Sequence, residues 1–305
     1  MVWLASTLVF VLLRLAPGDP YSTRLDGFPV SESQRALWRS QRALDAPLMT
    51  QYVHWVANSA RGNLGWSSMH QRPVADVLAE LLPRTLSLLS LGLVSSLVFG
   101  MALGAWQGAR GGDGDAAVSA ASLVVYSVPQ FWLALLLLQL FAHELGWLPA
   151  SGMVEATHDY LGPLERVKDR IRHLLLPWLS LTLIGTAVFA RYQRSAMRDA
   201  WRAPFVDTAR AKGLPDWRVG WHAWRTALTP VITLAGLVFP SLLGGAVFVE
   251  RVFSWPGMGN ATVLAVGARD YEFVTAAVLV GSAMTVTGSL LADWLQGLVD
   301  PRVRP

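Results

Sequence analysis

Residues 85–106 read TLSLLSLGLVSSLVFGMALGAW, a run that contains no Asp, Glu, Lys or Arg. An α-helix needs about 20 mainly apolar residues to cross the hydrocarbon core of a bilayer, and this run has that length. The rest of the 305-residue chain agrees, because 53% of it is hydrophobic and only 15% is charged. The mean hydropathy of +0.38 is too high for an ordinary soluble domain. The sequence therefore predicts an integral membrane protein built from helices.

Five further apolar windows flank this run: 2–16, 116–142, 174–190, 227–249 and 273–292. From residue 85 onward none of the windows carries a charged side chain, so each can lie in hydrocarbon without a buried charge. The first window is shorter, and Arg14 near its end can reach the membrane surface. It lacks a basic leading segment and a small-residue cleavage site, so we predict a retained helix and not a signal peptide. We expect an all-α protein with six transmembrane helices in one domain, 1–305.

The distribution of basic residues predicts how the helices are oriented. The segment 191–226 holds eight Arg and Lys residues against three Asp, whereas 250–272 holds only two basic residues. Because short loops rich in Arg and Lys stay in the cytoplasm, 191–226 is predicted to be a cytoplasmic loop, with both termini inside. The net charge of +4 follows from such loops, so we expect no nucleic-acid partner.

The long segment 17–83 is predicted to lie outside the membrane, since loops of that length cross largely regardless of charge. Its leucines and aromatic residues recur at helical spacing, with breaks at Pro47, Gly62 and Gly65. This pattern favours short amphipathic helices on the outer membrane face. At the other end of the chain, 244–259 is rich in Phe, Val and Trp and contains Pro256, so we expect an ordered element there.

Several kinds of chemistry have no support in the sequence. Without cysteine the chain has no disulfide and no thiol nucleophile. Neither lysine follows a glycine, which a phosphate-binding loop requires, and the six histidines form no H-E-x-x-H motif. No G-x-S-x-G motif occurs either. We therefore expect no catalytic residue, metal or cofactor in this chain.

Residues 203–213 are predicted to form a short cytoplasmic helix that a partner protein could grip. Arg210 and Lys212 supply charge, and Gly213 can end the helix with a positive φ. The predicted docking face consists of small or apolar side chains: Phe205, Val206, Ala209 and Ala211. A basic loop that only fixes orientation is the alternative.

This stretch resembles the coupling loop of bacterial ABC-importer permeases of the dipeptide, oligopeptide and nickel family. That loop has an acidic residue, two small residues, three variable positions and a glycine, and residues 207–214, DTARAKGL, look like it. Other segments are similar to the B-type permease subunit of the family: LRLAPGDP (13–20), RGNLGWS (61–67), RPV (72–74), SVPQFWLALLLL (127–138), GGAVFVERVFSWPGMG (244–259) and DPRVR (300–304). The resemblance covers essentially the whole chain.

The resemblance implies a type I ABC-importer permease fold in the bacterial inner membrane, and a transport subunit that is not an enzyme. Its path would carry peptides or similar small solutes delivered by an extracytoplasmic binding protein. It implies a homologous second permease in a heterodimer and two cytoplasmic ATPases that bind ATP and Mg. The implied coupling residues are Phe205, Asp207, Thr208, Ala209, Arg210, Ala211, Lys212, Gly213 and Leu214. The implied element at the outer mouth comprises Glu250, Phe253, Trp255, Pro256, Gly257 and Gly259.

Three alternatives stay open at this point. An ion-coupled carrier usually keeps ionisable groups in its spans, yet from residue 85 the spans are uncharged until Asp293. An intramembrane enzyme would need a nucleophile and a base within the spans. Within the importer class, nickel or opines could replace peptides as the substrate.

Overall fold

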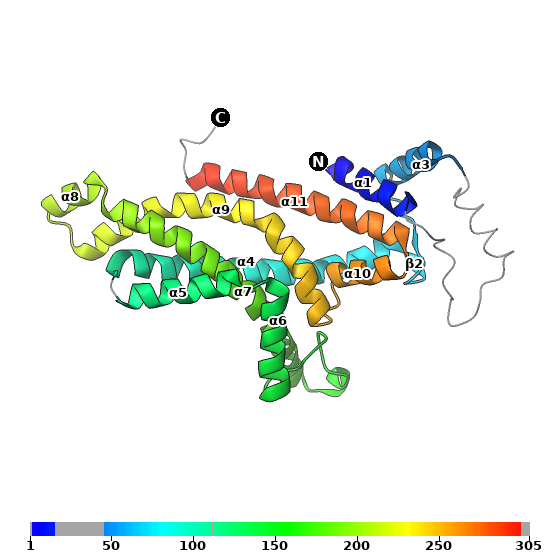
Figure 1. The fold of residues 1–305 in the computed structure, drawn as a ribbon, viewed down its shortest axis with the longest axis horizontal. Coiled ribbons are helices and arrows are strands. Elements are labelled where there is room, and N and C mark those ends of the chain that lie inside the picture. The colour runs from blue at the N-terminus through cyan, green and yellow to red at the C-terminus, as the bar shows by residue number, and fades with distance from the viewer. Residues whose placement is uncertain (1, 16–45, 112, 300–305) are drawn as a thin grey trace. The chain divides into compact units, whose positions relative to one another are not determined.

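The computed structural model describes residues 2–15, 46–111 and 113–299 (Figure 1). The motif at 300–304, most of the motif at 13–20, and the part of the predicted amphipathic segment 17–83 that precedes residue 46 lie outside these residues. The chain divides into two compact units. Unit 1 comprises Met1–Arg84 and Gly257–Val286, and unit 2 comprises Thr85–Pro256 and Thr287–Pro305.

The described chain is mostly helical, as predicted. Three helices are long and apolar enough to cross a membrane: α4 (Val74–Arg110), α7 (Pro163–Trp201) and the Tyr271–Trp294 part of α11 (Tyr271–Val299). A bent pair of helices makes a fourth if it counts as one span. The window 227–249 lies within α9 (Asp216–Val252), and α1 (Val2–Leu15) is a shorter apolar helix. The number of six spans and the inside position of both termini stay predictions.

The window 116–142 is not one straight helix. α5 (Asp113–Ser127) and α6 (Gln130–Leu138) meet at an angle of 101°, and a π-helical turn, Gln139–Glu144, continues from α6. Pro129, with φ −57° and ψ 138°, stands at the break. A proline cannot donate a backbone hydrogen bond and disfavours helical geometry in the residue before it, so Val128 and Pro129 separate the two helices.

Close backbone packing joins the unit 2 part of α4 to α7. Three glycines spaced four residues apart, Gly100, Gly104 and Gly108, face α7. A Cβ atom at Gly100 would lie 2.5 Å from the Cβ of Phe189, and one at Gly108 would lie 2.7 Å from the Cβ of Met197. Such small residues let two helix backbones approach closely, which is how membrane helices commonly associate.

The remaining helices of unit 2 pack around α7. It packs against α5, α6 and α9, and α9 also contacts α6 and the short helix α8 (Pro204–Ala211). Near α8 the contact between α7 and α9 is a cluster of small and sulfur-containing side chains: Met197, Ala200, Ala223 and Ala227. In Figure 1, α8 lies at the end of the α7 and α9 pair.

Unit 1 has its own hydrophobic core. The first turns of α4, the helix α10 (Met258–Gly267) and the start of α11 supply most of its buried side chains, including Val77, Ala265 and Phe273. The helix α3 (Leu48–Ala60) follows Pro47 and ends before Gly62, whose φ is 78°, so the helix and its predicted breaks are confirmed. Its Trp55 stacks on Phe10 of α1 at 5.2 Å between ring centroids.

A short hairpin in unit 1 is held by a distant carboxylate. Strand β1 (Trp66–Ser67) pairs antiparallel with β2 (Arg72–Pro73). Asp270, only 2% exposed, accepts hydrogen bonds from the Ser67 hydroxyl at 2.5 Å and from the Met69 amide at 3.0 Å. It also caps α11 by accepting from the Phe273 amide at 3.3 Å. Burial lowers the pKa of nearby His70, whose ring nitrogen lies 3.0 Å from the Ser67 hydroxyl.

Candidate functional site

The helix α8 has clear start and stop signals. Pro204 occupies its first turn, where a missing N–H costs no helical hydrogen bond. At the other end Gly213 has a φ of 76°. The amide of Gly213 donates to the Arg210 carbonyl at 2.9 Å, and that of Leu214 donates to the Ala209 carbonyl at 3.2 Å. This pair of bonds is the Schellman motif, so the helix and the positive φ predicted for Gly213 are confirmed.

A cavity of about 470 Å³ opens between α8 and the start of α9. Five of the residues expected to couple to an ATPase line it: Phe205, Thr208, Ala209, Lys212 and Leu214. The other three lining residues, His222, Arg225 and Thr226, are not among the predicted coupling residues. These three stand at positions i, i+3 and i+4 of α9, and that spacing could have placed them on one helix face.

The other predicted coupling residues lie elsewhere on α8. Asp207, Arg210 and Ala211 do not line the cavity, and the guanidinium of Arg210 lies 5.5 Å from the ring centroid of Trp201. Val206 is only 1% exposed, so its predicted place on the docking face is wrong. An amphipathic helix turns its branched apolar side chain toward its own protein, which leaves the smaller residues exposed.

The cavity is electropositive. Lys212, His222 and Arg225 line it, and in the described ranges no acidic side chain forms an ion pair with any of them. Thr208 and Thr226 donate their hydroxyl protons to backbone carbonyls of their own helices. An acidic or carbonyl-bearing side chain would therefore complement this cavity.

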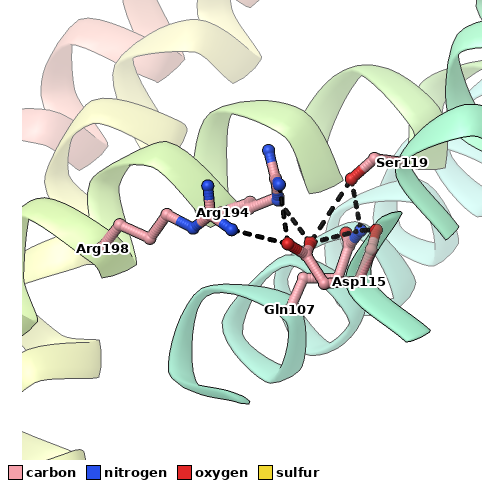
Figure 2. Close-up of polar contacts among 5 residues, drawn as sticks. All are labelled: Gln107, Asp115, Ser119, Arg194 and Arg198. Carbon is pink, nitrogen blue, oxygen red and sulfur yellow. Dashed lines mark hydrogen bonds and ion pairs between the residues drawn. The ribbon is translucent and has the colours of Figure 1, made fainter. Parts of the chain in front are cut away.

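A second polar cluster ties α5 to α7 (Figure 2). Asp115, 5% exposed at the start of α5, accepts from Nε and Nη2 of Arg194 at 2.5 and 2.7 Å. It also accepts from Nη2 of Arg198, one helical turn further along α7, at 2.5 Å. Gln107 of α4 and Ser119 of α5 complete the cluster at longer distances. The two parallel bonds of Arg194 are the strong form of arginine and carboxylate pairing.

Arg194 and Arg198 belong to the basic segment 191–226, which the sequence predicts to be a cytoplasmic loop. The helix α7 instead continues to Trp201, which brings both arginines to Asp115. No sequence spacing could have shown this pairing, since Asp115 lies 79 residues before Arg194. The cluster holds the start of α5 against the helix that leads into α8.

The segment 244–259 is ordered, as predicted. α9 extends to Val252, the chain turns through Ser254 with a φ of 49°, and Gly257 precedes α10. In unit 2, Glu250 is fully buried and accepts a hydrogen bond from the Thr85 hydroxyl at 2.6 Å. Phe253 and Trp255 are also buried, Pro256 follows them, and Gly259 stands in the first turn of α10. The place of this element at the outer mouth of a transport path stays a prediction.

Comparison with known proteins decides what this architecture belongs to. Residues 97–305 match the family described as the binding-protein-dependent transport system inner membrane component. The chain belongs to this permease family. It is thus an inner-membrane permease subunit of an ATP-driven importer, and neither an enzyme nor an ion-coupled carrier.

Individual relatives cover nearly the whole permease. It is 38% identical to the di/tripeptide transport system permease protein DppB of Pseudomonas aeruginosa, over 97% of this chain and 93% of the relative. It is 34% identical to the oligopeptide transport system permease protein AppB of Bacillus subtilis, with the same coverage. It is 37% identical to the glutathione transport system permease protein GsiC of Escherichia coli K12, over 99% and 94%. Permeases of this class work with a partner permease, with ATPases that bind ATP and Mg, and with a binding protein.

Proposed function

We propose that this permease and a homologous, non-identical partner permease form the path for peptides delivered by an extracytoplasmic binding protein. The names of three relatives that match nearly the full chain refer to oligopeptides, di- and tripeptides and glutathione, which is itself a peptide. Because these names refer to peptides, we propose peptides and not nickel or opines as the substrate. The chain works as a single transmembrane domain, 1–305, with 17–83 outside and 191–226 in the cytoplasm.

Two cytoplasmic ATPases would drive the path through α8. The face of α8 that lines the cavity, with exposed Phe205 and Thr208 and half-buried Ala209, would dock in a groove of one ATPase. Lys212 and Arg225 of the same electropositive cavity would receive an acidic side chain of that ATPase. The single observation that carries this proposal is that α8 exposes Phe205 and Thr208 at a cavity whose Lys212 and Arg225 form no ion pair within the described ranges.

The links around α8 are short enough to transmit a displacement. Only Arg202 and Ala203 separate α7 from α8, and only residues 212–215 separate α8 from α9. α7 and α9 are also packed together beside α8 through the Met197 and Ala223 cluster. A pull on α8 as the ATPases close would therefore move α7 and α9 together. This movement would switch the path between its inward and outward openings.

Two substitutions test this coupling role. Gly213→Val forces a β-branched residue into a positive φ at a cost of about 1–3 kcal/mol, and Ala209→Glu places a bulky acid on the docking face. In the assembled importer we expect both variants to insert and bind the partner permease but to recruit the ATPases poorly. Peptide uptake and substrate-stimulated ATP hydrolysis should fall together.

The matched control is Gly111→Val, since Gly111 also has a positive φ, 65°, with open space around its Cβ position. It introduces similar backbone strain outside α8 and should leave ATPase recruitment normal. Gly213→Val and Ala209→Glu complexes that recruit ATPases and import peptide like the wild type would show that α8 does not couple the ATPases to transport. The basic loop would then only fix the orientation of the permease in the membrane.

A further inference from the structure

A second cavity, of about 610 Å³, lies within unit 2 between α5, α6, α7 and α9. Its size falls within the range of about 300–1,000 Å³ that is typical of small-molecule sites. Aliphatic side chains from α7 and α9, including Val188, Leu234 and Val238, form much of its wall. Five polar residues also line it: Tyr126, Gln130, Arg191, Tyr192 and Ser195.

One face of α7 supplies most of the lining. Positions 184, 188, 191 and 195 follow each other at helical spacing and border the cavity. The neighbouring Arg194 points to Asp115 instead and is paired there. The helix thus carries one arginine that is satisfied within the protein and another, Arg191, that borders open space.

The polar groups of the cavity offer more donors than acceptors. The guanidinium of Arg191 lies 5.3 Å from the ring centroid of Tyr126, and no acidic side chain of the described chain pairs with it. The Nε2 of Gln130 is buried without a hydrogen-bond partner. A buried donor without an acceptor is costly, so a ligand that brings acceptor oxygens would be stabilised here.

We infer that this cavity binds the terminal carboxylate of a peptide in transit. Arg191 pairs with the carboxylate, because a guanidinium can give a carboxylate two parallel hydrogen bonds. The Gln130 amide donates to the carboxylate or to the last peptide carbonyl, and the aliphatic wall accepts varied side chains without specific contacts. This inference rests on the proposed import of peptides.

The location and exposure of Arg191 agree with a transient site. It follows the uncharged window 174–190 directly, at the end that leads to α8. The residue is exposed, so water competes for the guanidinium and a bound carboxylate can leave. A path must bind its cargo weakly enough to release it, as conduction through channels also requires.

The test compares two substrates in proteoliposomes that contain both permeases, the ATPases and the binding protein. One is trialanine with a free carboxylate, and the other is trialanine with a C-terminal amide. For each peptide the uptake of a variant is divided by that of the wild type, so any preference of the binding protein cancels. We expect Arg191→Gln to lower this ratio about tenfold for the free acid, the loss typical of one hydrogen bond to a charged group. The ratio for the amide should stay near one.

Further variants separate the possible outcomes. Arg191→Lys keeps the charge and should restore part of the uptake, whereas Gln130→Leu should lower uptake of both peptides modestly. Arg170→Gln removes an equal charge from α7 outside the cavity and should affect neither peptide selectively. Each complex is checked for assembly by size-exclusion chromatography before transport is measured.

Equal ratios for the acid and the amide in an assembled Arg191→Gln importer would overturn the inference and leave peptide import standing. The inference also fails if Arg191→Gln changes uptake only in vesicles that contain phosphatidylglycerol, because the cavity then holds a lipid headgroup. Failure of the proposed function looks different, since the wild-type complex would then import neither peptide.

Discussion

Replacing Gly104 by alanine should separate α4 from α7. A Cβ atom there would lie 2.7 Å from the Cβ of Gln193 and 2.9 Å from the backbone nitrogen of Arg194, with the carbonyl oxygen of Ala190 closer still. Carbon atoms in contact prefer about 3.5–4.0 Å, so the two backbones must move apart by roughly 1 Å. Overpacking of this kind costs about 1–3 kcal/mol of the free energy of unfolding.

The control must remove the intrinsic preference of alanine for helices, which favours it over glycine by about 1 kcal/mol. Gly244→Ala serves this purpose, because Gly244 is helical, belongs to the same unit and has no atom within 4 Å of its Cβ position. We expect Gly244→Ala to be neutral or slightly stabilising, and Gly104→Ala to lie about 1–3 kcal/mol below it.

Unfolding of the purified permease in detergent, followed by the fluorescence of its 14 tryptophans during SDS titration, measures this difference. Gly104→Leu should be worse than Gly104→Ala, because its larger side chain cannot fit between the helices. If Gly104→Ala unfolds at the same SDS concentration as Gly244→Ala, the close approach of α4 and α7 is wrong.

Two further predictions concern the end of unit 2 that carries α8 and the Asp115 cluster. Asp115→Asn should lower the melting temperature of the complex, since Arg194 and Arg198 lose their shared carboxylate. Arg194→Lys should lower it less, because lysine keeps the charge but cannot bond both oxygens of Asp115 in parallel. Unchanged melting in both variants would show that the cluster adds nothing to stability. In a chain without native cysteine, Thr208→Cys should react with a membrane-impermeant maleimide only in inside-out vesicles, and labelling only from the outer face would reverse the topology.

Local signals in the sequence predicted local structure well. Pro47 stands directly before α3, and Gly62 after α3 and Gly213 after α8 follow helix ends with the positive φ that glycine allows. Pro129 carries an equally clear signal for a break inside the apolar window 116–142. The apolar window alone does not show this bend, because hydrophobicity measures the tendency to enter a membrane and says nothing of the path of the backbone.

Pairings across the chain could not be predicted in the same way. The spacing of Gly100, Gly104 and Gly108 indicates a close helix contact, yet it does not say that α7 is the partner. Arg194 and Asp115 are both ordinary charged residues in the sequence, and only the fold brings them together. The cavity lined by Arg191 is formed by residues of four helices. The helical spacing within α7 therefore predicts only the residues that α7 contributes, and not the cavity itself.

The hydrogen bond between Ser67 and Asp270 has a consequence for how the protein is made. The two residues stand 203 positions apart, and a ribosome adds about 5–20 residues per second, so the hairpin waits roughly 10–40 s for its acceptor. During that time the Ser67 hydroxyl and the Met69 amide lack the Asp270 carboxylate, which accepts a hydrogen bond from each of them in the folded protein. Unit 1 therefore completes its folding last, after nearly the whole of unit 2 has been synthesised. Truncated chains that end before residue 270 should be recognised as unfinished and degraded.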